Sequence, residues 1–482
     1  MKSKYLYKLL SGLAIAAAMM LAFSACELVD PTNVTNPQIT DDALRENATG
    51  GTASLITGLR REFSDAMRQV HIIDVVSDNY FNTASFISNN LDRPSSVTPL
   101  DLTLPGVYHA QLELVALADF GLNTIIPNDK QATNNQSAEA RFYKGMSLVL
   151  LAENFSAFPI QELGPPVTSR QAATLAVDEF KTAFGLTSDA NMKINCKLAL
   201  ARAYRLAGDK ANAAAEAQAA LALPNAANYV FNAQYDAAQL SNTPVGRVVS
   251  VADLQPLPRL DFLDPKYTVN NTPIPSLKAE EAHLIIAEVA LVNGDLAGGR
   301  TAMANAVTLA LSRPVTNFND RDNRLNRPND PNWTVKASPT APAIPGLIQK
   351  RGGGTAGTQV KLYAISGTSL TVAAINALAT ANATEHYRIL YLLRQEIFFL
   401  EARRMSDLGI RLPVSDRQIQ TNQNVAAAAV GRSVIVPSYI PAGGTELDRF
   451  TVDATAGVVT IAHDMNQLIA DNIQQISPFL AQ

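Results

Sequence analysis

A helical hairpin that occurs twice is the feature that most limits how this chain can fold. Residues 197–225, KLALARAYRLAGDKANAAAEAQAALALPN, show the spacing of one helix that ends at Gly208 and a second that starts after Asp209. Residues 282–307, AHLIIAEVALVNGDLAGGRTAMANAV, repeat this order around Gly294. Small residues are frequent in both segments, and helices with small side chains at their contact can approach closely. The sequence therefore predicts two pairs of tightly packed helices.

Both hairpins fit the residue pattern of tetratricopeptide-like repeats. In the first hairpin, anchored on Gly208, the matching positions are Leu200, Ala201, Tyr204, Ala213 and Ala220, with Pro224 near the end. In the second hairpin, anchored on Gly294, they are Ile286, Ala287 and Ala306. Because a long insertion separates the two copies, whereas the repeats of a solenoid follow one another closely, the pattern does not predict a plain solenoid. An alanine-rich hairpin unrelated to this repeat is the alternative.

Four further segments have apolar residues at helical spacing, namely 44–69, 104–126, 137–155 and 386–413. Ser137 is expected to cap the third helix. In the fourth, Arg394, Glu401 and Arg404 lie on a common side, and Asp407 follows three residues later. Guanidinium groups beside carboxylates usually hold a structure together, so these residues predict a buried network of ion pairs rather than a catalytic site.

The N-terminal segment has the organisation of an export signal. Three lysines occur among the first eight residues, residues 9–23 are almost wholly apolar, and small residues precede Cys26 in a way that resembles a bacterial lipobox. We therefore expect residues 1–25 to be a signal peptide, residues 26–40 a tether lipidated at Cys26, and residues 41–482 the folded domain. An ordinary signal peptide with an incidental cysteine is the alternative.

Charge and cysteine content limit the partners of the mature chain. After residues 1–25 are removed, the 39 Lys and Arg fall by three to 36, against 43 Asp and Glu, a net charge of about −7. Such a chain is not expected to bind nucleic acid. No later stretch reaches about 18 unbroken apolar residues, so no other segment is expected to span a bilayer. If Cys26 is acylated, Cys196 has no partner for an internal disulfide, and the core must stabilise the fold.

Motifs for catalysis and for cofactor binding are weak. None of the five histidines lies in a paired metal-binding spacing, and no Gly-x-Ser-x-Gly motif occurs. Residues 352–357, GGGTAG, fit a dinucleotide-binding pattern formally, but a strand-like segment follows them instead of a helix. Asp320 and Asp322 begin a calcium-like spacing that Arg324 interrupts. We therefore predict no enzymatic activity, no catalytic residue, no cofactor and no metal.

Several segments, in a fixed order, resemble the SusD/RagB family of nutrient-binding outer-membrane lipoproteins. After Cys26, these are AEARFYKGMSLVLLAENFSAFPI at 138–160, the hairpin at 197–225, AEVALVNGD at 287–295, and RQEIFFLEARRMSDL at 394–408. The last segment resembles a late Glu-Gly-x-Arg-x-x-Asp-Leu helix of the family. Glu401, Arg404, Asp407 and Leu408 match it, whereas Ala402 replaces the glycine. Tryptophan, which many members use more often, occurs only at Trp333.

This resemblance implies a mostly α-helical, SusD-like domain built on tetratricopeptide-like helix pairs, with a loop-rich variable part. It implies a lipid anchor in the outer membrane at the cell surface, to which the acidic residues after Cys26 add weak support. The expected partner is a TonB-dependent, SusC-like β-barrel transporter, to which the protein delivers an oligosaccharide or a peptide. A tetratricopeptide-type scaffold lipoprotein that binds only proteins, in the outer membrane or the periplasm, is the alternative.

Two loop-like stretches combine aromatic rings with amides and charges, as a sugar-binding surface requires. They are SDNYFNTASFISNNLDRP at 77–94 and NFNDRDNRLNRPNDPNW at 317–333. The candidate ligand-binding residues are Asn79, Tyr80, Phe81, Asn89, Asn90, Arg93, Phe318 and Trp333. Tyr80 and Asn90 are favoured, because the resemblance places part of the family's binding site in the first stretch. The alternative for each stretch is a solvated connection with a few anchoring aromatics.

Overall fold

The described part of the chain begins after the N-terminal segment. The computed structural model describes residues 49–82, 90–247, 254–320, 328–351 and 359–481. The expected signal peptide at 1–25 and the tether at 26–40 lie outside these residues. No helix within them is long and apolar enough to cross a membrane.

Long helices form one part of the molecule. They are α3 (Gly51–Met67), α5 (Leu104–Phe120), α7 (Asn134–Asn154), α8 (Ser169–Leu186), α9 (Ala190–Ala207), α10 (Lys210–Leu221), α12 (Ala279–Val292), α13 (Leu296–Ser312) and α15 (Ala383–Ile397). Shorter helices are α4 (Val70–Val75), α6 (Ile126–Asn128), α11 (Thr243–Val245), α14 (Val372–Asn376), α16 (Arg404–Asp407), α17 (Asp416–Thr421), α18 (Gln423–Ala427), α19 (Met465–Asp471) and α20 (Ile473–Ile476). A π-helical turn, η3 (Gly121–Ile125), joins α5 to α6, and 3-10 turns form η2 (Pro94–Ser96), η5 (Pro258–Leu263) and η6 (Pro441–Gly444).

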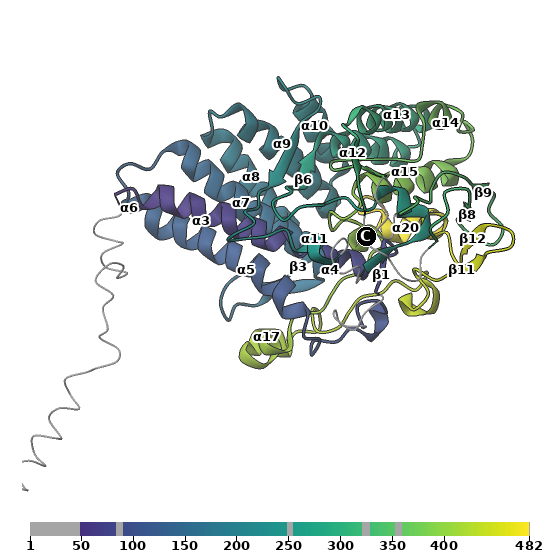
Figure 1. The fold of residues 1–482 in the computed structure, drawn as a ribbon. Coiled ribbons are helices and arrows are strands. Elements are labelled where there is room, and N and C mark those ends of the chain that lie inside the picture. Colours follow the sequence, from purple (N-terminus) through teal and green to yellow (C-terminus); the bar gives the residue numbers. More distant parts are fainter. Residues whose placement is uncertain (1–48, 83–89, 248–253, 321–327, 352–358, 482) are drawn as a thin grey trace, which may run out of the picture.

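Short strands occur in both the helical part and the loop-rich part. They are β1 (Tyr80–Asn82), β2 (Ala157–Pro159), β3 (Pro166–Thr168), β4 (Val230–Ala233), β5 (Leu254–Pro256), β6 (Ile274–Lys278), β7 (Thr316–Phe318), β8 (Thr334–Lys336), β9 (Ala343–Ile344), β10 (Val360–Leu362), β11 (Phe450–Asp453) and β12 (Val458–Ile461). Most of them pair two by two, and the largest sheet has the order β11-β12-β8-β9 with a parallel β12–β8 pair. Figure 1 shows β1 and this sheet together at the end of the molecule away from α3 and α6.

The two predicted hairpins are confirmed. Gly208 ends α9 in the left-handed conformation, with φ 81°, and the Asp209 side chain accepts a hydrogen bond from the Asn212 backbone at the start of α10. The second copy repeats this chemistry, with Gly294 at φ 80° and Asp295 capping α13. Glycine adopts the left-handed conformation at no steric cost, which explains why both turns have a glycine at this position.

Packing joins these hairpins to the earlier helices in one series. Helix α7 packs on α8, α8 on α9, α9 on α10, and α10 on α12. The contact of α7 with α8 is so close that a Cβ at Gly145 would lie 2.5 Å from the Phe180 ring. Helix α8 was not predicted from the sequence. The observed fold is therefore the predicted mostly helical one, with one more helix in the series than the sequence indicated.

Two local predictions were wrong. The cap of α7 is Thr133, not Ser137, because Thr133 and Gln136 form a reciprocal capping box one turn earlier. Residues 386–413 are not one helix: α15 ends at Ile397, and a turn precedes α16. In that turn Leu400 and Ala402 have positive φ angles of 55° and 57°.

Charged side chains in and around the turn between α15 and α16 form ion pairs with residues of several other elements. Glu401 accepts from Lys278 Nζ at 2.6 Å, Arg394 Nε lies 2.8 Å from Asp407, and Arg404 donates to Asp78 at 2.8 Å. The buried pairs that surround these contacts form the ion-pair core, which we define as Asp78, Glu153, Arg202, Arg205, Lys266, Lys278, Glu281, Glu288, Arg394, Glu401, Arg403, Arg404 and Asp407. The predicted buried ionic network is confirmed, although most partners lie outside the segment that predicted it.

Candidate ligand-binding site

Tyr80 and Phe81, two of the predicted ligand residues, lie on opposite faces of strand β1. Phe81 is half-buried and meets the Phe450 ring edge-on, with 5.5 Å between ring centroids. Its backbone lies opposite Gln255 in the β1–β5 pair. Since successive side chains of a strand point to opposite faces, Phe81 points outward where Tyr80 points inward. Of these two aromatic residues, Phe81 is the one placed to meet a ligand.

Tyr80 and Asn79 are buried completely, which corrects their predicted role at a surface. Tyr80 stacks on Phe399 with centroids 5.1 Å apart and donates from its hydroxyl to Asp264 at 3.1 Å. The Asn79 side chain accepts from Gln395 at 3.2 Å. In this conformation neither side chain can touch a ligand. They anchor the loop that presents Phe81.

The remaining residues of the first stretch lie at the surface or outside the described part. Asn90 and Arg93 are exposed in the turn before η2, where the Arg93 backbone donates to the Asn90 carbonyl at 2.9 Å. Asn89 lies outside the described residues. Asn90 and Arg93 remain candidates for polar contact with a ligand.

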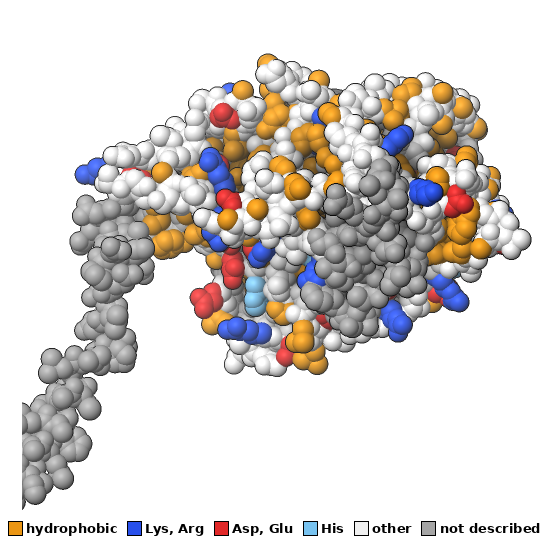
Figure 2. All heavy atoms as spheres, viewed as in Figure 1, with side chains coloured by type: hydrophobic (Ala, Val, Ile, Leu, Met, Phe, Trp, Pro, Cys, Tyr) orange, Lys and Arg blue, Asp and Glu red, His pale blue; other side chains and the backbone are white. Residues whose placement is uncertain are grey.

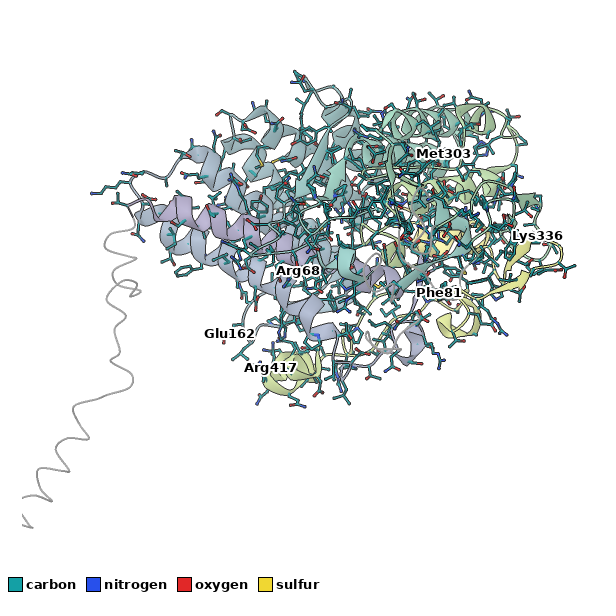
Figure 3. The ribbon with its side chains drawn as sticks, viewed as in Figure 1. Arg68, Phe81, Glu162, Met303, Lys336 and Arg417 are labelled. Atoms are coloured by element: carbon teal, nitrogen blue, oxygen red, sulfur yellow. The ribbon has the colours of Figure 1, made fainter. Side chains whose placement is uncertain are left out.

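The second stretch brings two more aromatic residues to the same part of the molecule. Phe318 is half-buried on β7 and lies opposite Val360 of β10. Trp333, also half-buried, directly precedes β8. A Cβ at Gly457 would lie 3.1 Å from the Trp333 ring, so the β11–β12 turn packs closely on the indole. Figure 3 places Phe81 and Lys336 in this loop-rich part, far from Glu162 and Arg417.

A pocket of about 400 Å³ lies between η5, residues 346–350 and β10. It is lined by Phe262, Pro331, Gly346, Ile348, Gln349, Lys350, Gln359, Lys361 and Tyr363. Two of these residues connect the pocket to the predicted stretch at 317–333, since Pro331 lies within it and Lys361 pairs with Asn317 across β7 and β10. We call it the β10 pocket. Sequence reasoning missed it, because its residues come from separate segments that only the fold brings together.

One wall of the β10 pocket is fixed by hydrogen bonds. The Gln349 side chain accepts from the Lys361 backbone at 2.7 Å, and the Gln349 backbone donates to Asp261 at 2.6 Å. The ring of Tyr363 meets Phe262 edge-on at 5.9 Å, and partial burial raises the pKa of Tyr363. The pocket therefore offers a neutral phenol, an amide and apolar ring surface on a preformed support.

Next to this pocket, the guanidinium of Arg351 forms ion pairs with several carboxylates. Arg351 contacts Asp320 at 2.7 Å, Asp261 at 3.2 Å and Asp264 at 3.4 Å. Asp320, the first residue of the calcium-like spacing, is thus an arginine partner, and Asp322 lies outside the described residues. Within the described ranges no cluster of three or more metal-ligating side chains occurs.

Solved structures resemble this arrangement over most of the chain. A SusD superfamily protein from Bacteroides fragilis aligns with 79% of this chain and 99% of its own, with a TM-score of 0.54 and 11% sequence identity. A SusD-like carbohydrate binding protein from Bacteroides fragilis aligns with 91% of this chain and 100% of its own, with a TM-score of 0.52 and 13% identity. This chain has the SusD-like fold. No protein-family model matches the sequence, and no curated protein is similar to it.

Within this SusD-like fold, a pair of carboxyl groups joins the first predicted stretch to the segment before β11 of the C-terminal sheet. Asp92, which accepts from the Asn82 backbone at 3.0 Å, shares a hydrogen bond with Asp448 just before β11. Burial is the main cause that raises the pKa of Asp92 to about 6 and that of Asp448 to about 8, and for Asp448 the neighbouring Asp92 adds to it. A shared proton therefore holds the η2 loop against β11.

Two larger pockets of the SusD-like fold flank α17, at a distance from the predicted residues. Each has a volume of about 550 Å³. One contains Glu113, Glu162 and Arg417, and the other contains Leu100. Leu100 is 70% exposed, and Leu102 is 94% exposed. This surface therefore combines exposed apolar side chains with charged groups of both signs.

Proposed function

We propose that this protein is a cell-surface lipoprotein that binds an oligosaccharide nutrient and delivers it to a partner TonB-dependent, SusC-like β-barrel transporter. The observation that carries this function is that the half-buried aromatic residues Phe81, Phe318 and Trp333 and the β10 pocket all lie in the loop-rich part of a SusD-like fold. The name of one structural relative, a carbohydrate binding protein, supports a sugar over a peptide. Membrane attachment through Cys26 belongs to the same proposal.

The site offers groups for the two kinds of contact that a sugar makes, one through its apolar ring face and one through its hydroxyl groups. The apolar face of a sugar ring can lie on an aromatic ring, as ligand sites combine apolar surface with a few placed polar groups. Its hydroxyl groups can bond amides and charged groups, which the exposed lining residues Gln359 and Lys361 offer. A site that is partly preformed loses little entropy on binding.

Sugar hydrolysis is not supported by the same geometry. Glycoside hydrolases hold two carboxyl groups about 5–9.5 Å apart on either side of the scissile bond. Asp92 and Asp448 instead bond directly to each other, so no sugar fits between them. The β10 pocket itself contains no Asp or Glu among its described lining residues. We therefore propose binding without bond cleavage.

The first test is a pull-down of the native protein in mild detergent, with partners identified by mass spectrometry. We expect a stoichiometric β-barrel transporter. Recovery of periplasmic or assembly proteins without a barrel would refute transporter delivery. In parallel, Cys26→Ala should release the protein from membranes, whereas the control Cys196→Ala, at a buried thiol, should leave it attached.

A protein-binding scaffold is the second candidate function. The exposed Leu100 in the pocket beside α17, and the exposed Leu102 two residues further along the chain, favour it, because exposed apolar side chains that lie close together are typical of protein interfaces. The double variant Leu100→Asp and Leu102→Asp separates the two functions. Loss of every co-purified protein with intact sugar binding would assign this surface to a partner and the loop-rich part to the ligand.

A further inference from the structure

The β10 pocket carries positive charge without an opposite charge in its walls. Lys350 and Lys361 are exposed at its edge, and its described lining includes no acidic residue. This is unusual for a chain with 43 Asp and Glu against 39 Lys and Arg. On the face shown in Figure 2, Lys and Arg side chains are more prominent than Asp and Glu over the loop-rich part.

Several other lysines of the described chain form ion pairs. Lys144 and Lys197 pair with glutamates at 2.8 Å and 2.6 Å, and Lys278 pairs with Glu401 at 2.6 Å. Neither Lys350 nor Lys361 forms an ion pair with any residue that the structure describes. Both side chains are exposed, so their ammonium groups are available to a ligand.

The carboxylate nearest to the pocket wall is already engaged. Asp261 Oδ2 accepts from the Gln349 backbone at 2.6 Å, and its Oδ1 lies 3.2 Å from the Arg351 guanidinium. Because Asp261 is buried and held by these donors, it cannot turn outward to neutralise the lysines. The hydrogen bond from the Lys361 backbone to Gln349 also fixes the position from which the Lys361 side chain starts.

We infer that the β10 pocket selects an anionic oligosaccharide, one whose sugars carry carboxylate or sulfate groups. This inference rests on the proposed function and narrows it to one class of ligand. Lys350 and Lys361 contact the anionic group, while Tyr363 and Phe262 supply the apolar surface beneath the ring. A neutral sugar would cover the two ammonium groups without pairing them, and this desolvation disfavours it relative to an anionic one.

The test is calorimetric titration of the full folded domain with three probes: oligogalacturonate, a carrageenan oligosaccharide, which carries sulfate but no carboxylate, and a neutral malto-oligosaccharide. We expect at least one anionic probe to bind roughly tenfold more tightly than the neutral probe. The double variant Lys350→Met and Lys361→Met should lose about that factor, and added salt should weaken the unmodified protein more than the variant. Comparison of the two anionic probes assigns carboxylate or sulfate.

The matched control is Lys130→Met with Lys210→Met, two exposed lysines in the helical part. It should bind the anionic probe as the unmodified protein does, and circular dichroism should show both double variants folded. A preference for the neutral probe, or unchanged anionic binding in the Lys350/Lys361 variant, would overturn the inference and leave sugar binding intact. Failure to bind any sugar in any arm would overturn the proposed function as well.

Discussion

The ion-pair core and the edge of the β10 pocket use charge in opposite ways. In the ion-pair core, each charge is buried and faces a partner, as in Arg205 with Glu288 at 2.6 Å and Arg404 with Asp78 at 2.8 Å. In the loop-rich part, Lys350 and Lys361 are exposed, and Asp92 and Asp448 share a proton. A buried pair defines one packing, because loss of either partner leaves a charge without compensation. Because Lys350 and Lys361 form no ion pair with a described residue, their ammonium groups can pair with a ligand instead.

The largest effect is expected where the ion-pair core is broken. Arg404 is 1% exposed, bonds both Asp78 oxygens and donates to Asn466 at 2.9 Å. Arg404→Ala should lower the free energy of unfolding by about 3–5 kcal/mol, because Asp78 would remain buried and charged. Urea unfolding followed by circular dichroism measures this change.

The control is Arg93→Ala, at an exposed arginine of the loop-rich part. It should change the free energy of unfolding by less than about 0.5 kcal/mol. An equal loss in the two variants would mean that burial of the ion pairs does not distinguish the two regions.

The second effect concerns the ligand and not the fold. Phe81→Ala removes a half-buried ring beside Phe450. It should weaken sugar binding by about 1.5–3 kcal/mol, or roughly tenfold to a hundredfold, as expected when apolar surface of one aromatic side chain is lost. Titration calorimetry measures it. Phe120→Ala, at an exposed ring of α5, is the control and should bind normally.

The third effect is a pH dependence of stability. Because the folded-state pKa values of Asp92 and Asp448 are raised to about 6 and about 8, the fold favours their protonated forms. The stability that these groups contribute is present at low pH and is lost as the pH rises through about 6 to 8. Both side chains are partly exposed, so solvent screening limits the change to about 1–2 kcal/mol.

Thermal unfolding at pH 5 and pH 9 tests this dependence. Asp448→Asn, which imitates the protonated carboxyl, should raise the melting temperature at pH 9 and flatten the pH profile between pH 6 and 8. Asp471→Asn, at an exposed carboxylate of α19, should leave the profile as it is. A profile that stays steep in Asp448→Asn would exclude the shared proton as its source.

The smallest effect lies in the turn between α15 and α16. Ala402 has φ 57°, where an L-residue other than glycine is strained by about 1–2 kcal/mol. Ala402→Gly should therefore stabilise the protein by about 0.5–1 kcal/mol, after the greater unfolded-state entropy of glycine is counted. Ala287→Gly, in the middle of α12, should destabilise it by about 1 kcal/mol. Denaturant midpoints of the two variants would show the opposite signs.

Local sequence signals predicted the helical part well. The turns at Gly208 and Gly294 carry their own chemistry, since glycine permits the left-handed conformation and the following aspartate caps the next helix. The break after Ile397 was not visible, because Leu400 and Ala402 are ordinary helix residues that tertiary contacts force to positive φ. Glycine in place of Ala402, as in the family pattern, would have signalled that turn.

The site was only partly predictable for a different reason. Composition located the stretches at 77–94 and 317–333, but it could not tell Tyr80 from Phe81, because that depends on the pairing of β1 with β5. The β10 pocket combines η5, residues 346–350 and β10, which only the folded chain brings together. Asn79 and Tyr80 therefore proved to be anchors, whereas Phe81, Asn90, Arg93, Phe318 and Trp333 stay predictions for the ligand.

The pairing of Arg404 with Asp78 also has a consequence for the order in which the protein folds. These partners are 326 residues apart in the chain, and Gln395 reaches Asp78 across 317 residues. An N-terminal fragment that ends at α13 can form its helix hairpins, because their contacts are local, but it leaves Asp78 without its guanidinium. The Arg404–Asp78 pair at the centre of the protein therefore cannot form until almost all of the chain has been synthesised. Such late formation of a long-range contact is typical of slow, high-contact-order folding.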